Sequence, residues 1–123
     1  QWIEKIVQNI ASNYGGKANI KFKSIAPPVY NDPELTNLLS TCAMNFMEKE
    51  NIVYLENPSL GAEDFAFFLQ DVPGTMFRLG VAGNQGCAPL HSGNFSLDER
   101  SLELGIKILS QTLVMASKTL QDI

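Results

Sequence analysis

The sequence is poor in the side chains that usually bind catalytic metals or form disulfides. It contains one histidine and two cysteines among 123 residues. A catalytic zinc ion takes about three protein ligands, usually histidine, cysteine or carboxylate, and two cysteines do not make a disulfide framework. His91 is therefore either an ordinary surface or packing histidine, or one ligand of a site whose other ligands lie elsewhere.

Long apolar runs and basic clusters are also missing. The apolar runs are far shorter than the roughly 20 residues that span a bilayer. A net charge of −4 without a basic run argues against nucleic-acid binding. The chain does not open with a basic segment followed by an apolar one, so no signal peptide is visible. We expect a soluble, cytoplasmic protein that binds neither a membrane nor a nucleic acid.

The beginning of the chain predicts one helix and one strand, which are too little for a domain. Apolar residues recur at helical spacing over residues 2–13, without an N-terminal cap, and alternate with polar ones over Ile20–Lys23. A single helix and strand bury too little surface to fold alone. Because Pro27 and Pro28 then stiffen the chain, we interpret residues 1–26 as the tail of another domain in a longer polypeptide.

Two longer helices are expected after these prolines. Asp32 is a good N-cap and Pro33 suits the first helical position, so a helix is predicted from there to Glu50. The capping-box pattern Ser96–Glu99 predicts the start of the last helix, whose apolar face we expect to be buried. That face comprises Leu102, Ile106, Leu109, Leu113, Ala116 and Leu120.

Strands are expected between these helices. Ile52–Leu55 and Met76–Val81 have strand patterns, a short helix is predicted from Gly61, and residues 82–94 form a polar loop. The alternation of helices and strands favours an α/β fold with a partly parallel sheet.

Three polar clusters lie at the ends of these elements, where α/β folds bind ligands. They are Tyr30–Asp32, Gly61–Asp64 and Leu90–Ser92, which contains His91. Structural roles stay open for the first as a helix cap and for the acids of the second as partners of a helix dipole. Cys42 is interpreted as a core residue. Cys87, four residues before His91, is either an ordinary thiol or a metal-binding partner.

The order of these clusters is typical of a known family. The relevant segments are Pro27–Asp32, Gly61–Phe65 and Leu90–Ser92, the last followed by Phe95 and Asp98–Glu99. With them the chain resembles the C-terminal part of the M20 family of metallo-amidohydrolases and metallopeptidases, also called aminoacylase-type. The Gly-Ala-Glu-Asp-Phe segment is similar to the amidohydrolase branch, which includes hippurate hydrolases and N-acyl amino-acid amidohydrolases.

The resemblance implies a fold and a division into domains. Residues 27–123 would be the C-terminal part of a zinc-peptidase-like catalytic domain with three layers and a mixed sheet. Residues 1–26 would be the last helix and strand of a smaller α+β lid, which family members often use for dimerisation. A homodimer is therefore expected.

The resemblance also implies roles for particular residues. His91 matches a ligand of the family's two divalent metal ions, zinc or manganese. Gly61, Ala62, Glu63 and Asp64 match a segment that borders the substrate. The remaining metal ligands and the glutamate general base match nothing in this chain, so no catalytic residue is assigned.

The implied reaction is hydrolysis of a small N-acyl amino acid by a metal-activated water molecule. The chain alone is expected to be inactive. Within the family, an exopeptidase or dipeptidase remains the alternative. Outside it, the alternative is a non-catalytic α/β binding or dimerisation module, which the lone histidine would suit.

Overall fold

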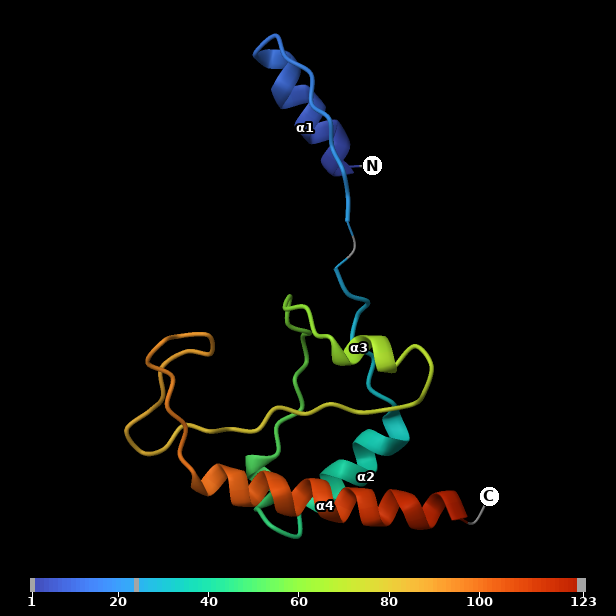
Figure 1. The fold of residues 1–123 in the computed structure, drawn as a ribbon, viewed down its shortest axis with the longest axis vertical. Coiled ribbons are helices and arrows are strands. Elements are labelled where there is room, and N and C mark those ends of the chain that lie inside the picture. Colours follow the sequence, from blue (N-terminus) through green and yellow to red (C-terminus); the bar gives the residue numbers. More distant parts are fainter. Residues whose placement is uncertain (1, 24, 122–123) are drawn as a thin grey trace.

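The computed structural model describes residues 2–23 and 25–121, with side chains as far as Lys118. Its helices are well separated along the chain (Figure 1). They are α1 (Trp2–Asn13), α2 (Pro33–Ala43), the 3₁₀ helix η1 (Lys49–Asn51), α3 (Phe65–Phe68) and α4 (Arg100–Gln121). None of the described helices is long and apolar enough to cross a membrane.

Helix α1 occupies the range predicted from its apolar spacing. It ends before Gly15, whose φ of +70° is a backbone conformation that glycine adopts at little cost. The chain then returns along the helix, since the Gln8 side chain hydrogen-bonds both to the N–H and to the carbonyl of Ala18. Among the described elements, α1 makes no contact with another helix, and it projects away from the rest (Figure 1).

Helix α2 begins as predicted and ends earlier. The Asp32 Oδ1 atom accepts a hydrogen bond from the Leu35 N–H at 2.9 Å, which confirms the cap. The predicted extension to Glu50 is wrong, because the helix stops at Ala43. Beyond it, the Asn45 N–H donates to Cys42, three residues back, so the last turn tightens and the helical ladder ends.

The core lies where α2 packs on α4, the pair of described helices that are in contact. Its residues are mostly small, which lets the backbones approach closely. Gly105 of α4 faces a third segment, because a Cβ atom there would lie only 2.9 Å from the side chain of Leu79, in the extended stretch after α3. The buried residues on the two helices are Ser40, Cys42, Ala43, Ser101, Gly105, Ile108 and Thr112.

The apolar face predicted to be buried on α4 is largely exposed among its described side chains, which do not include that of Leu120. Ile106 is 65% exposed and Leu113 is 70% exposed. Each buried position on α4 is followed directly in sequence by an exposed apolar residue. Because successive residues of an α-helix are about 100° apart around its axis, α4 has two neighbouring apolar faces. The face of small residues packs, and the face of large ones remains uncovered. The exposed face, which we call the leucine face, comprises Leu102, Ile106, Leu109 and Leu113.

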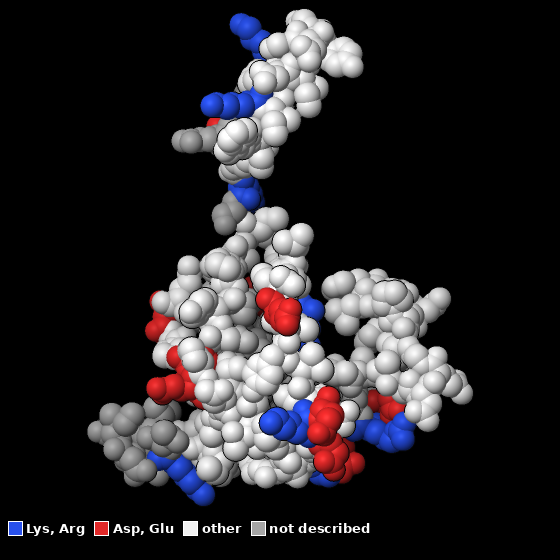
Figure 2. Space-filling view, turned by 180° about the vertical axis from the view of Figure 1, so that it is seen from behind, with Lys and Arg blue, Asp and Glu red and all other residues white. Residues whose placement is uncertain are grey.

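The leucine face is part of a wider pattern of uncovered apolar surface. Uncharged residues make up most of the side of the molecule drawn in Figure 2, with acidic and basic side chains interspersed. Many large apolar side chains are exposed on α1 and in the segment after η1. They include Trp2, Ile3, Ile6, Ile10, Val53, Tyr54 and Leu55.

The described residues contain no β-strand, so the predicted partly parallel sheet is absent from the structure. Ile20–Lys23, Ile52–Leu55 and Met76–Val81 have no strand alongside them (Figure 1). The physical reason is that a strand requires a neighbour whose backbone completes the hydrogen-bond ladder. Met76 instead bonds to a side chain. Asn31 donates through Nδ2 to the Met76 carbonyl at 2.8 Å and accepts through Oδ1 from its N–H at 2.9 Å.

Candidate functional site

The loop that carries His91 leaves and returns at one place. The Asp98 N–H donates to the Val81 carbonyl at 2.9 Å, which joins the two ends of the loop. Close to that junction, Gly83 and Gly86 form an isolated antiparallel bridge. The loop therefore has a closed base beside the start of α4 (Figure 1).

His91 lies exposed in a tight turn within this loop. The Ser92 N–H donates to the Pro89 carbonyl at 3.1 Å, which places His91 third in the turn. Its φ is +68°, and no other described non-glycine residue has a positive φ. Such a conformation costs a residue with a Cβ atom roughly 1–2 kcal/mol and would suit glycine better. Strain of this kind concentrates at functional sites, which gives His91 a structural mark beyond its residue type.

The predicted substrate segment forms the approach to α3. Gly61, Ala62, Glu63 and Asp64 are all exposed. The carbonyls of Glu63 and Asp64 accept the first helical hydrogen bonds, from Ala66 and Phe67, each at 3.1 Å. Both acids therefore lie at the positive end of this short helix, as the structural alternative for them proposed.

The structure does not join His91 to this segment. Among the described residues, no hydrogen bond or ion pair connects them, and no group of three potential metal-ligating side chains occurs. One exposed imidazole fits a divalent cation as a single ligand, and the described part of the chain does not complete a site. The metal and substrate roles of these residues remain predictions.

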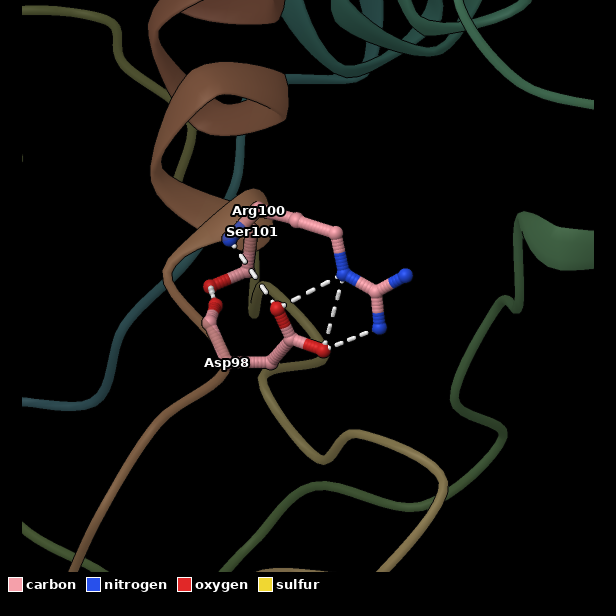
Figure 3. Close-up of polar contacts among 3 residues, drawn as sticks. All are labelled: Asp98, Arg100 and Ser101. Carbon is pink, nitrogen blue, oxygen red and sulfur yellow. Dashed lines mark hydrogen bonds and ion pairs between the residues drawn. The ribbon is translucent and has the colours of Figure 1, made fainter.

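Helix α4 begins with a different cap from the one predicted. The capping box placed its start at Ser96, whereas Asp98 caps it (Figure 3). The Asp98 Oδ1 atom accepts from the Arg100 N–H at 3.0 Å, and the Asp98 carbonyl accepts from the Ser101 N–H and hydroxyl. Since Asp98 is already bonded to Val81, the helix starts where the loop closes. Aspartate is as good a cap as serine, so this alternative was visible in the sequence.

Arg100 also binds the Asp98 carboxylate with its side chain. The Arg100 Nε atom lies 2.9 Å from Oδ1, and Nη2 lies 2.5 Å from Oδ2 (Figure 3). These side-chain hydrogen bonds, followed by the backbone N–H of Arg100, lower the pKa of Asp98 from 3.8 to about 2. Because the pKa of Asp98 is lowered in the folded state, its ionised carboxylate stabilises the folded state at pH values above about 4. This contribution disappears as the pH falls from about 4 to about 2.

We predict that Arg100→Gln raises the pKa of Asp98 without restoring its ordinary value. The side-chain hydrogen bonds are lost, whereas the backbone N–H of residue 100 still donates to the carboxylate. Carboxyl titration by NMR measures the change. Arg78→Gln is the matched control, because the Arg78 side chain donates to the Ser59 hydroxyl instead of to Asp98. An unchanged pKa in Arg100→Gln would contradict the prediction.

The sequence comparisons identify the class of protein. Residues 4–115 match the model of peptidase family M20/M25/M40, so the chain belongs to this family. The resemblance inferred from the three polar segments is thereby confirmed. Relatives include hydrolases, deacetylases and carboxypeptidases, and the chain is accordingly part of a hydrolase family.

Three relatives illustrate the range of activities named among the similar proteins. The chain is 39% identical over 112 residues to a probable hydrolase of Synechocystis, a match that covers 89% of this chain and 28% of the relative. It is 38% identical over 107 residues to thermostable carboxypeptidase 1 of Saccharolobus solfataricus, a match that covers 85% of this chain and 26% of the relative. It is 35% identical over 109 residues to N-acetyldiaminopimelate deacetylase of Pediococcus pentosaceus, a match that covers 86% of this chain and 27% of the relative.

The chain thus spans little more than a quarter of the length of these curated relatives. No solved structure matches it.

Proposed function

We propose that the natural polypeptide carrying this segment is a metal-dependent hydrolase of N-acyl amino acids, with His91 as one of its metal ligands. The observation that carries the proposal is the conformation of His91. This exposed imidazole occupies a strained left-handed turn in a loop with a closed base, within a chain of a hydrolase family. The backbone conformation at this position favours glycine, yet the residue is histidine. This suits a residue that is present for its side chain.

Within this proposal, the metal centre contains two divalent ions, zinc or manganese, and His91 supplies one neutral imidazole nitrogen. When bound, such ions polarise an amide carbonyl and lower the pKa of a bound water molecule. The other ligands and the general base would come from parts of the family protein that this chain does not span. The segment Gly61–Asp64 would border the substrate, where its exposed acids can contact polar groups or orient neighbouring side chains.

The names of several relatives support this substrate class. Several relatives are called N-acetyldiaminopimelate deacetylases, and one is called a putative amidohydrolase. A deacetylase of that kind hydrolyses an amide between an acyl group and an amino acid. Two relatives are called thermostable carboxypeptidases, which favours an exopeptidase as the second candidate. Both candidates release a free amino acid from a small substrate.

The fold expected for the complete protein fits the surfaces that remain uncovered. We propose that Ile52–Leu55 and Met76–Val81 become strands of a mixed sheet once neighbouring strands are present, and that the leucine face of α4 packs on that sheet. Residues 1–26 would belong to a separate lid that pairs two subunits, and residues 27–123 to the catalytic domain. The exposed apolar residues of α1 and α4 support this arrangement.

A substrate panel tests the proposal. The longest natural polypeptide containing this segment is expected to release free amino acid from N-acetyl or N-benzoyl amino acids, and a chelator is expected to abolish the release. Zinc or manganese added in excess of the chelator should restore it, which separates metal removal from general inactivation.

The outcomes discriminate the alternatives. Cleavage of dipeptides without cleavage of N-acyl amino acids would favour the exopeptidase. A folded polypeptide that binds no metal and cleaves nothing would overturn both and leave the non-catalytic binding module.

A further inference from the structure

Cys87 forms a second closure of the loop, inside the one made by Val81 and Asp98. The thiol Sγ lies 3.0 Å from the Ser96 carbonyl oxygen and 3.2 Å from the Ala88 carbonyl oxygen. A thiol has one proton, so these two carbonyls share it, and the shorter contact is the one across the loop. This contact joins residues nine apart in sequence, with His91 between them.

The segment enclosed by this contact contains two consecutive turns. The Ser92 N–H donates to Pro89, and the Phe95 N–H donates to Ser92 at 3.0 Å. His91 keeps its positive φ inside the first turn. A strained residue of this kind persists only where its surroundings fix the backbone, and the shorter the closed loop, the fewer conformations compete.

The thiol is engaged with backbone carbonyls, and this distinguishes its role from that of a ligand. A cysteine that binds a metal does so as a thiolate, whose sulfur no longer has a proton to donate. Cys87 is half-buried at the base of the turns and donates to two carbonyl oxygens. Its position therefore suits closing the loop rather than completing a Cys-His metal pair.

We propose that Cys87 is a positioning residue, whose thiol holds the loop in the conformation that presents His91 to a metal ion. The metal part of this inference rests on the proposed function. The closure of the loop by the thiol is a property of the chain itself and can be measured with no metal present. Two kinds of measurement consequently test the two parts separately.

The experiment compares Cys87→Ala and Cys87→Ser in the natural polypeptide. In metal-free protein, Cys87→Ala is expected to raise the amide exchange rates of Ser92 and Phe95 about tenfold, because the turns open more often. Zinc affinity, measured by competition with a chromophoric chelator, is expected to fall about tenfold for one equivalent. Turnover at saturating zinc should stay unchanged. Cys87→Ser keeps a donor and should recover most of both losses.

The matched control is Cys42→Ala. Cys42 is the other cysteine, only 2% exposed, and lies on α2. This variant is expected to lower global stability while leaving zinc affinity and loop exchange unchanged.

Unaltered exchange at Ser92 and Phe95 in Cys87→Ala would overturn the proposal, as would equal loss of zinc affinity in the Cys42 and Cys87 variants. Failure of Cys87→Ser to recover would overturn the hydrogen-bonding role. A wild-type protein that binds neither zinc nor manganese would refute the proposed function and the metal-presenting role, while the exchange rates would still decide whether the thiol closes the loop.

Discussion

His91→Ala in the natural polypeptide is expected to lower kcat/KM for amide hydrolysis by more than about 100-fold. Residues that merely support a metal ligand already cost about 10- to 100-fold when removed, and a direct ligand should cost more. One equivalent of bound metal should be lost as well. Metal analysis of the purified protein, together with steady-state kinetics on an N-acyl amino acid, measures both effects.

The control for this variant is a second substitution at the same position, His91→Gly, which tests the strain in the backbone. Glycine adopts a φ of +68° without strain, so His91→Gly should be about 1 kcal/mol more stable than His91→Ala in urea unfolding. Both variants should be equally inactive, since neither has an imidazole. Normal metal content and turnover in His91→Ala would refute the ligand role. Equal stability of the two variants would refute the strained turn.

Leu113→Asp is expected to lower the free energy of unfolding of the natural polypeptide by about 3 kcal/mol or more. Leu113 is 70% exposed in this chain, and a charge at such a position would ordinarily cost little. The large effect is expected because the proposed arrangement buries the leucine face against a sheet, where an aspartate would lose its hydration. Urea unfolding followed by circular dichroism measures the difference.

Lys107→Asp is the matched control on the opposite side of α4. Lys107 forms an exposed ion pair with Glu103, one helical turn earlier, with 2.5 Å between Nζ and Oε1. Its replacement should change stability by less than about 1 kcal/mol, because exposed ion pairs contribute little. A similarly small effect of Leu113→Asp would mean that the leucine face is exposed in the complete protein, and the proposed packing would be wrong.

Local signals in the sequence predicted the helices better than they predicted packing. The range of α1 and the start of α2 at Asp32 and Pro33 depend on apolar spacing and capping, which act within one turn. The start of α4 was placed too early because Ser96 and Asp98 are both competent caps. Only the bond from Asp98 to Val81, which closes a long loop, selects the second.

Long-range pairing explains the remaining differences. The predicted strands have suitable residues, yet a β-sheet hydrogen-bond ladder needs a neighbouring strand. The backbone of Met76 hydrogen-bonds to the Asn31 side chain instead. For α4, spacing alone does not tell which of two adjacent apolar faces packs. The presence of His91 on a loop was predictable from the surrounding turn-forming residues. Its positive φ and the contact between Cys87 and Ser96 depend on how the loop closes and have no local signal.

The close approach of Leu79 to Gly105 carries an evolutionary consequence. An alanine at position 105 would place its Cβ atom 2.9 Å from the Leu79 Cδ2 atom, so the Leu79 side chain would have to shift. A larger side chain at position 105 should therefore accompany a smaller one at position 79. Across related sequences, these two sites should covary, and that record would mark the contact between the extended segment and α4 as an inherited feature of the family.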